Sequence, residues 1–213
     1  MGYHIERPRE AGTTRRDALG MAMALLGGTF TVGMAAPEDT APPDDECLIE
    51  YDAEFEEALA LAEAELPDDT PRFGPPTKGA PPLRRSYRVT EPYGVRGNWA
   101  GGHHTGVDLA VPRGTPVYAV GGGTVVLAAR SGSYGNAVTV RMPDGHYAVY
   151  AHLHRIRTRK GTPIPTGARI GDSGSTGRTT GPHLHLEIRA RRGYGSDVNP
   201  VSYLARRGVP IHG

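Results

Sequence analysis

The stretch TVVLAARSGSYGNAVTVRMPDGHYAVYAHL, residues 124–153, decides the fold class of this chain. It contains three short runs rich in Val, Ala and Tyr, at residues 124–129, 136–142 and 146–153, with glycines between them. Runs of this length and composition predict β-strands. The Pro-Asp-Gly sequence at 143–145 is typical of a hairpin turn. The stretch therefore predicts an antiparallel β-sheet.

The rest of the C-terminal half supports this prediction. Residues 116–120, 168–174 and 183–189 are also strand-like, and no segment after Leu83 has clean helical periodicity. The chain has 213 residues with 30 Gly and 19 Pro, which argues against a helical bundle. Its single Cys excludes a disulfide framework and a multi-Cys zinc site. We expect a mainly β protein whose compact antiparallel domain, residues 84–213, is large enough for its own core.

Charge is segregated along the sequence. Between Pro37 and Pro71 there are fourteen acidic residues and no Lys or Arg, whereas residues 84–213 hold eighteen Lys plus Arg and six Asp plus Glu. The formal net charge of +1 conceals this division. Residues 72–83, RFGPPTKGAPPL, are typical of an extended linker. The pattern predicts an acidic, Pro-rich segment and linker over 37–83, followed by a basic domain.

Residues 1–36 have the layout of an export signal. Four arginines precede a stretch without charge at 18–36, which ends in small residues. Arg15 and Arg16 lie just before that stretch and resemble a twin-arginine signal. A cleaved signal, an uncleaved membrane anchor and neither remain open, as does the export route. We expect a secreted or wall-associated protein.

The acidic segment contains one amphipathic pattern. Residues 37–52 have the composition of a disordered chain, whereas residues 52–66 place Phe55, Leu59, Ala62 and Leu66 at helical spacing. The sequence predicts a short helix there. This helix is either a solvated acidic spacer, the interpretation we favour, or an inhibitory segment that docks onto the basic domain.

Seven of the nine histidines lie between residues 103 and 185, in the clusters HHTGVD (103–108), YAHLH (150–154) and GPHLHLE (181–187). A catalytic zinc site uses three His or carboxylate ligands and keeps one position open. His183 and His185 are two apart on an expected strand, so they lie on one face with Cα atoms about 6.5–7 Å apart. His104 and Asp108 can share an ion only if the chain turns between them, and Gly106 permits this.

Three segments in this order carry a specific resemblance: HTGVDLAVPRGTPVYAVGGGTVV (104–126), YAHL (150–153) and GSTGRTTGPHLHLEIR (174–189). They resemble the lysostaphin-type (LytM-type) zinc metallopeptidases, which are bacterial peptidoglycan endopeptidases with a β-rich, duplicated-hybrid-motif-like fold. The resemblance covers roughly residues 90–204. It implies one Zn²⁺ per chain.

The resemblance also implies roles for individual residues. His104, Asp108 and His185 match the metal ligands, and His152 and His183 match the two catalytic histidines that do not bind metal. His103 and His154 are additional, and we expect neither to be a ligand. No HExxH motif supplies a Glu base, so His152 and His183 are expected to orient and deprotonate water and to protonate the leaving amine. The sequence does not divide these roles between them.

Two glycine-rich loops, residues 131–136 and 174–181, are expected to flank the cleft and approach a peptide backbone. Tyr134, Asn136 and Thr180 are the substrate-binding residues that we expect from them. The predicted function is a secreted zinc-dependent endopeptidase that hydrolyses peptide cross-links or bridges of peptidoglycan. The alternative is a non-catalytic module of the same fold that binds peptidoglycan or activates an amidase.

The basic domain predicts an anionic partner. For an exported enzyme, anionic wall polymers fit this charge. No nucleic-acid-binding motif accompanies the arginines, so nucleic acid is not expected. Membrane contact is expected only if the N-terminal segment stays uncleaved. The bond that is cut and the oligomeric state remain open.

Overall fold

The computed structural model describes residues 52–65 and 78–212. The predicted export signal at 1–36, the acidic residues 37–51 and the first part of the predicted linker lie outside these residues. Among the helices in the described ranges, none has the length and apolar character needed to cross a membrane.

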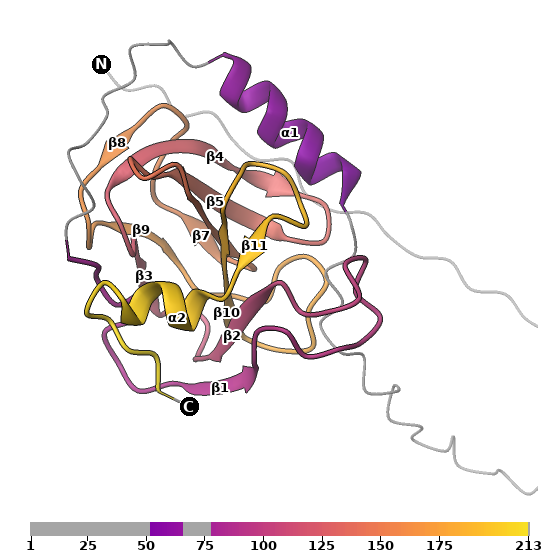
Figure 1. Ribbon diagram of the computed structural model, residues 1–213, viewed down its shortest axis with the longest axis vertical. Coiled ribbons are helices and arrows are strands. Elements are labelled where there is room, and N and C mark those ends of the chain that lie inside the picture. Colours follow the sequence, from indigo (N-terminus) through magenta and orange to yellow (C-terminus); the bar gives the residue numbers. More distant parts are fainter. Residues whose placement is uncertain (1–51, 66–77, 213) are drawn as a thin grey trace, which may run out of the picture. The chain divides into compact units, whose positions relative to one another are not determined.

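Two antiparallel sheets form the domain (Figure 1). The larger, eight-stranded sheet runs β1 (Arg88–Glu91), β2 (Gly106–Ala110), β10 (His183–Arg189), β6 (Tyr147–Ala151), β5 (Gly135–Arg141), β4 (Gly123–Ser131), β8 (Pro163–Ile164), and β11 (Asp197–Val198) pairs with β10. The smaller sheet runs β3 (Pro116–Tyr118), β9 (Arg169–Asp172), β7 (Arg155–Ile156). The mainly β, antiparallel prediction is confirmed.

The stretch that opened the sequence analysis forms the meander β4–β5–β6. The backbone N–H of Met142 donates to the His146 carbonyl at 2.8 Å, and Gly145 has a φ of 82° at the turn. Glycine adopts this left-handed conformation without steric cost. The hairpin predicted from Pro-Asp-Gly is therefore confirmed.

Alternation along the strands divides the large sheet into two faces. On β10, Leu184, Leu186 and Ile188 enter the main hydrophobic cluster, which also contains Val117 and Ile170 from the small sheet. The alternate residues of β10 point to the other face, since successive side chains of a strand lie on opposite sides. Those residues include both histidines of the HLH motif, and all of them are buried. On β10, the residues of one face thus join the apolar core, and those of the other face are polar or charged.

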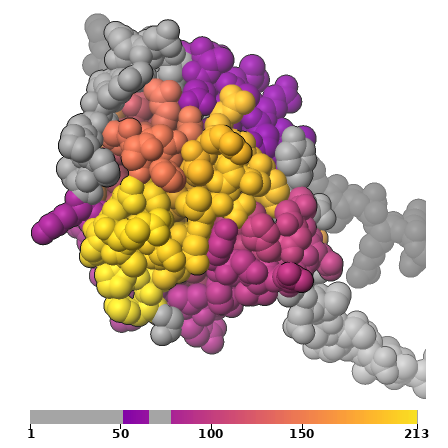
Figure 2. Space-filling view, in the orientation of Figure 1, coloured from indigo at the N-terminus to yellow at the C-terminus, as the bar shows by residue number. Residues whose placement is uncertain are grey.

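A short helix, α2 (Pro200–Ala205), covers part of the apolar face. Asn199 caps it by accepting hydrogen bonds from the backbone N–H groups of Val201 and Ser202, and Tyr203 and Leu204 enter the main cluster. Figure 2 shows the C-terminal residues, in yellow, gathered on one part of the domain surface. The sequence shows no clean helical periodicity after Leu83, so α2 was not expected.

The predicted helix of the acidic segment is α1 (Ala53–Ala64). Asp52 caps it by accepting a hydrogen bond from the backbone N–H of Phe55 at 3.0 Å. Phe55, Leu59 and Ala62 are buried in a second hydrophobic cluster, together with side chains of β4, β5 and β6. The favoured interpretation of a solvated spacer is therefore wrong, because the apolar face of α1 packs on the β domain.

Residues 79–83, at the end of the predicted linker, pack on the domain. The N–H of Gly79 donates to the Arg207 carbonyl, the N–H of Ala80 donates to the Val120 carbonyl, and Leu83 is buried in the main cluster. The folded chain after α1 therefore begins before residue 84.

Candidate metal and catalytic site

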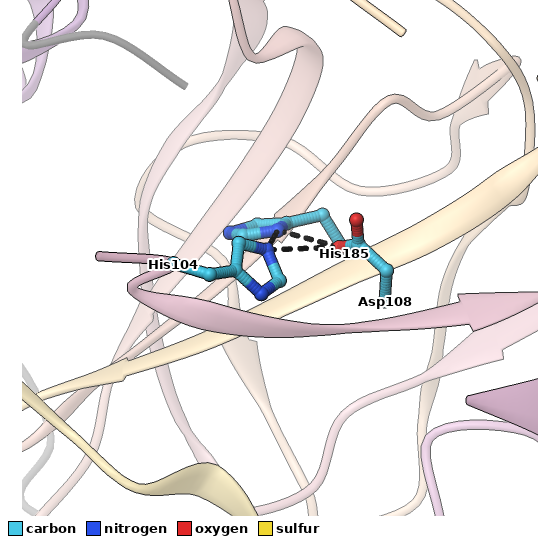
Figure 3. Close-up of side chains that lie close together, drawn as sticks. All are labelled: His104, Asp108 and His185. Carbon is cyan, nitrogen blue, oxygen red and sulfur yellow. Dashed lines mark hydrogen bonds and ion pairs between the residues drawn. The ribbon is translucent and has the colours of Figure 1, made fainter. Parts of the chain in front are cut away.

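Three predicted metal-ligating side chains come together on the polar face of the large sheet (Figure 3). Asp108 on β2 lies directly opposite His185 on β10 in the antiparallel register. Paired residues on neighbouring strands project from the same face, so the sheet itself brings these two side chains together. His104 lies just before β2 and completes the group. All three residues are buried.

The donor atoms of this group are spaced as ligands of a small metal ion. Nε2 of His104 lies 3.2 Å from Nδ1 of His185 and 3.4 Å from Oδ1 of Asp108. The Asp108 oxygen and the His185 nitrogen are 2.8 Å apart. A tetrahedral zinc site with metal–ligand distances of about 2.0–2.1 Å has ligand–ligand edges of about 3.3 Å. Two imidazoles and one carboxylate also match the ligand types that zinc accepts, so the residues fit a zinc ion.

Hydrogen bonds assign the proton of His104. Its Nδ1 lies 3.0 Å from the Pro92 carbonyl, which can only accept, so Nδ1 carries the proton. In the neutral ring, Nε2 then presents its lone pair to Asp108 and His185. A ligating histidine that is held through its other nitrogen by a backbone carbonyl is a usual arrangement in metal sites.

The same contacts perturb the charged forms of the other two residues. Burial alone would raise the pKa of Asp108, but the contacts of its carboxylate with the His104 and His185 rings hold that pKa well below its usual value. Burial alone would lower the pKa of His185, but its contacts with Asp108 and Glu187 raise it to about 9. The cluster therefore keeps a carboxylate anion buried and favours positive charge beside it, which is an environment suited to a cation.

Gly106 is needed at the site for close packing. A Cβ atom at this position would lie 2.5 Å from Cε1 of His185 and 2.7 Å from the carbonyl oxygen of Leu186. Gly106 is not among the glycines with positive φ. Gly106 was expected to permit a turn between His104 and Asp108, whereas it leaves room for the ring of His185.

The two predicted catalytic histidines flank the three ligand candidates. The His152 ring centroid lies 4.8 Å from that of His183 and 5.9 Å from that of His185. Nε2 of His183 lies 3.6 Å from Oδ2 of Asp108. In both rings Nδ1 donates to a backbone carbonyl at 2.9 Å, that of Thr176 for His152 and that of Gly181 for His183. In each neutral ring the lone pair therefore resides on Nε2.

The surroundings keep both rings neutral. Burial lowers the pKa of His152 to about 3, and the neighbouring His183 ring acts in the same direction. Burial also lowers the pKa of His183. A neutral imidazole has a lone pair on Nε2 that can accept a proton, so each ring presents the atom that proton transfer needs.

His152 also has an unusual backbone. Its φ is 59°, and among the described residues no other non-glycine residue has a positive φ. Such a conformation costs of order 1–3 kcal/mol and is concentrated at functional sites. His152 follows directly after β6. Its left-handed backbone turns the chain at this point, and its ring contacts that of His183.

Sequence reasoning missed two buried charged residues behind the site, Glu187 and Arg189. They continue the period-2 pattern of His183 and His185 on β10, so they lie on the same face. Nε of Arg189 donates to Oε1 of Glu187 at 2.6 Å, and Oε2 of Glu187 lies 3.6 Å from Nε2 of His185. The run HLHLEIR, with four polar residues at alternate positions of one strand, was the available signal.

The three expected substrate-binding residues lie in different environments. Tyr134 is fully buried, and its hydroxyl bonds to Glu187 and Arg189, so the expectation that it lines the groove is corrected. The side-chain amide of Asn136 donates to the Leu153 and His154 carbonyls and supports the chain after His152. Thr180 is exposed in the loop before His183 and stays a predicted substrate contact.

The two additional histidines lie outside the metal group. His103 bonds through its ring to the Gly101 carbonyl and to Asp197. His154 is half-buried, and its Nδ1 lies 2.9 Å from Nη2 of Arg113. Neither belongs to the group of residues that can hold a metal.

Comparison with known proteins relates this site to established relatives. The pattern of peptidase family M23 matches residues 102–200. Over 120 residues the chain is 44% identical to the DD-carboxypeptidase/endopeptidase Mpg of Neisseria meningitidis serogroup B, covering 54% of this chain and 26% of Mpg. Over 98 residues it is 46% identical to the peptidoglycan DD-endopeptidase ShyA of Vibrio cholerae, covering 46% of this chain and 22% of ShyA. The chain thus spans about a quarter of the length of these curated relatives.

A solved structure matches over nearly its whole length. The crystallised catalytic domain of the antimicrobial peptidase lysostaphin from Staphylococcus simulans superposes with a TM-score of 0.53 at 34% identity. The match covers 56% of this chain and 92% of that domain. The M23 pattern also spans every His and Asp position of the site described above. The lysostaphin-type resemblance is therefore confirmed, and the chain belongs to peptidase family M23, a family of zinc metallopeptidases.

Proposed function

We propose that this protein is an exported, zinc-dependent endopeptidase that hydrolyses peptide cross-links of bacterial peptidoglycan. The observation that carries the proposal is the convergence of His104, Asp108 and His185 beside two adjacent histidine rings with Nε2 lone pairs. This arrangement contains every group that metal-assisted peptide hydrolysis needs. A non-catalytic binding module would need none of the proton-transfer groups.

In this proposal His104 Nε2, Asp108 Oδ1 and His185 Nδ1 hold one zinc ion per chain. Zinc, when bound, supplies a Lewis acid that polarises a peptide carbonyl and makes water more acidic. The chain contributes a buried carboxylate that offsets the charge of the ion. It also contributes the hydrogen bond from His104 Nδ1 to the Pro92 carbonyl, which orients that ring.

His152 and His183 transfer protons in this proposal. Each is fixed through Nδ1, so Nε2 is the only ring atom that can exchange a proton during the reaction. The rings lie side by side, so Nε2 of one ring can take a proton from water, and that same proton is then available for the departing amine. The buried position of both residues limits competing exchange with solvent.

The relatives favour one class of bond. Mpg, at 44% identity, is named as a DD-carboxypeptidase/endopeptidase, and ShyA, at 46% identity, as a peptidoglycan DD-endopeptidase. The sequence left Gly-Gly bridges and D-Ala–diamino-acid cross-links open. We therefore propose the D,D type of cross-link as the substrate.

The export signal over residues 1–36 belongs to the proposal as well. Arg15 and Arg16 precede the uncharged stretch 18–36, and the substrate lies outside the cytoplasm. A secreted or wall-associated location follows.

A basic pocket of about 420 Å³ supports the proposed contact with anionic wall polymers. Its lining contains four arginines, Arg113, Arg155, Arg157 and Arg169, together with His154 and Asp172. Asp172 pairs with Arg157 and Arg169. Within the described residues, Arg113 and Arg155 have no carboxylate partner, so they can receive phosphate or carboxylate groups from outside.

Digestion of purified cell-wall sacculi tests the proposal. The full chain should release fragments with new amino groups, and mass spectrometry should place the cut at a D,D cross-link. His183→Ala should bind the same sacculi and release nothing. Binding without cleavage by the unaltered protein would favour the non-catalytic module, and cleavage at a Gly-Gly bridge would reject the D,D assignment alone.

A further inference from the structure

A line of contacts runs from helix α1 to the proposed metal site. Oε1 of Glu56 lies 2.7 Å from Nη1 of Arg189, and Nε of Arg189 lies 2.6 Å from Oε1 of Glu187. The other carboxylate oxygen of Glu187 lies 3.6 Å from Nε2 of His185. Glu56 precedes the region 102–200 that defines the family, so it is a feature of this chain outside the family pattern.

Arg189 is a buried cation at the centre of this line. Its side chain is fully buried, and it donates to Glu56, Glu187, the Tyr134 hydroxyl and the Arg192 carbonyl. A buried guanidinium requires carboxylate partners, since leaving it uncompensated is strongly unfavourable. Glu56 supplies the second of its two carboxylates.

The outer nitrogen of His185 needs an acceptor. Nε2 is buried, and no hydrogen bond of normal length reaches it within the described residues. When Nδ1 of a histidine binds a metal, Nε2 carries the proton and donates it to a carboxylate or carbonyl nearby. Glu187 is the carboxylate in position to accept it.

Glu187 therefore interacts with both Arg189 and His185, and Glu56 affects the balance between these two interactions because it also binds Arg189. With Glu56 in place, the positive charge of Arg189 is shared between two carboxylates. Without Glu56, Glu187 would be the one carboxylate bonded to Arg189. Because Arg189 would then attract more of its negative charge, Glu187 would be a weaker hydrogen-bond acceptor for His185.

We propose that Glu56 is a positioning residue for the metal site, acting through Arg189 and Glu187 on His185. Helix α1 then supports the metal site through Glu56, and it is neither a spacer nor a removable inhibitory segment. The proposal rests on the ligand assignment of His185 given above.

Other contacts fix Glu56 in place. Phe55, its neighbour, stacks on Tyr134 with ring centroids 4.1 Å apart, and Tyr134 donates to Glu187. At the other end of the helix, Glu63 accepts from the Tyr147 hydroxyl at 2.6 Å. Glu56 itself also accepts from the backbone N–H of Tyr194. The carboxylate is thus held by packing at both ends of α1.

The test is the zinc affinity of full-chain variants, measured by competition with a chromophoric chelator. Glu56→Ala removes the charge and the acceptor, whereas Glu56→Gln keeps an acceptor oxygen. Glu57→Ala makes the same charge change at an exposed position of α1. Leu204→Ala, in the main hydrophobic cluster on the other face of the sheet, is a control for lost stability. All measurements are made at a temperature where circular dichroism shows each variant folded.

We expect Glu56→Ala to weaken zinc binding about tenfold, the lower end of the range for groups that support a ligand. Glu56→Gln should show a smaller loss, and the two controls should stay within about twofold of the unaltered protein. Equal affinities for Glu56→Ala and Glu57→Ala would overturn the proposal, as would increased wall digestion by Glu56→Ala. Failure of the unaltered protein to digest sacculi would reject the proposed function and leave the affinity comparison intact.

Discussion

Oδ1 of Asp108 lies 2.8 Å from Nδ1 of His185, although 77 residues separate them in the sequence. Their antiparallel pairing on β2 and β10 sets this distance, and His104 adds its Nε2 atom at 3.2 Å from His185. The proposed zinc site is thus built into the register of the central strands.

Removal of one ligand should remove the metal. Asp108→Ala leaves two histidine nitrogens without the carboxylate that offsets the charge of zinc, so bound zinc should fall from about one per chain to near zero. Metal analysis after dialysis measures this. Asp144→Ala, in the turn between β5 and β6, is the matched carboxylate control and should keep its zinc. A full complement of zinc in Asp108→Ala would mean that other residues hold the ion.

Loss of His152 should abolish catalysis and leave the metal in place. Because φ of His152 is 59°, Asn is a better replacement than Ala, since Asn tolerates the left-handed region. His152→Asn should digest sacculi at least about 100-fold more slowly, the lower range for loss of a general acid–base group. Its zinc content should match that of the unaltered protein. Near-normal digestion by this variant would exclude His152 from proton transfer.

A single methyl group at Gly106 should disturb the site. A Cβ there would overlap the ring of His185, which must move away from Asp108 and His104. Zinc affinity of Gly106→Ala should fall by at least about tenfold. Gly193→Ala is the control, because a Cβ there meets nothing within 4 Å. Unchanged affinity in Gly106→Ala would show that the ring can shift without cost to the ligand geometry.

The docking of α1 should contribute measurably to stability. Leu59 is fully buried in the second cluster, whereas Leu61 on the same helix is 59% exposed. Leu59→Ala should lower the free energy of unfolding by about 2–5 kcal/mol, and Leu61→Ala by less than about 0.5 kcal/mol. Denaturant titration followed by circular dichroism compares them. Equal, small losses would mean that α1 does not stay on the sheet in solution.

Charge reversal in the basic pocket should weaken wall binding. Arg155→Glu replaces a cation without a carboxylate partner in the described residues, so co-sedimentation with sacculi should weaken about fivefold at low salt. The difference should shrink as ionic strength rises. Arg206→Glu makes the same change at the exposed end of α2 and should have little effect. Equal weakening by both variants would indicate a diffuse charge effect and no specific pocket.

The strands and the metal group could be predicted from sequence because their signals are local. The meander β4–β5–β6 follows from short runs with glycines between them, and His183 and His185 share a face because strands alternate. Their combination with His104 and Asp108 also required the family resemblance. Spacing alone could not say that β2 and β10 are neighbours.

The contacts of α1 could not be predicted in the same way. Glu56 and Arg189 are 133 residues apart, and neither residue's local pattern indicates the other. The segregation of acidic from basic residues was visible, but it is equally compatible with solvated and docked segments. Helix α2 is only six residues long, too short for a periodic signal, although Asn199 before Pro200 is a typical helix start. Tyr134 was expected to contact substrate, but it stacks on Phe55 of α1 and is buried. The local sequence around Tyr134 does not indicate this contact.

Reconstitution of zinc-free protein tests the central claim most directly. The chelated, dialysed full chain is titrated with zinc while the release of amino groups from purified sacculi is measured. We predict no release without metal, and a linear rise that ends at one zinc per chain. Full release by zinc-free protein, or none at any zinc concentration, would contradict the claim that His104, Asp108 and His185 hold the ion on which hydrolysis depends.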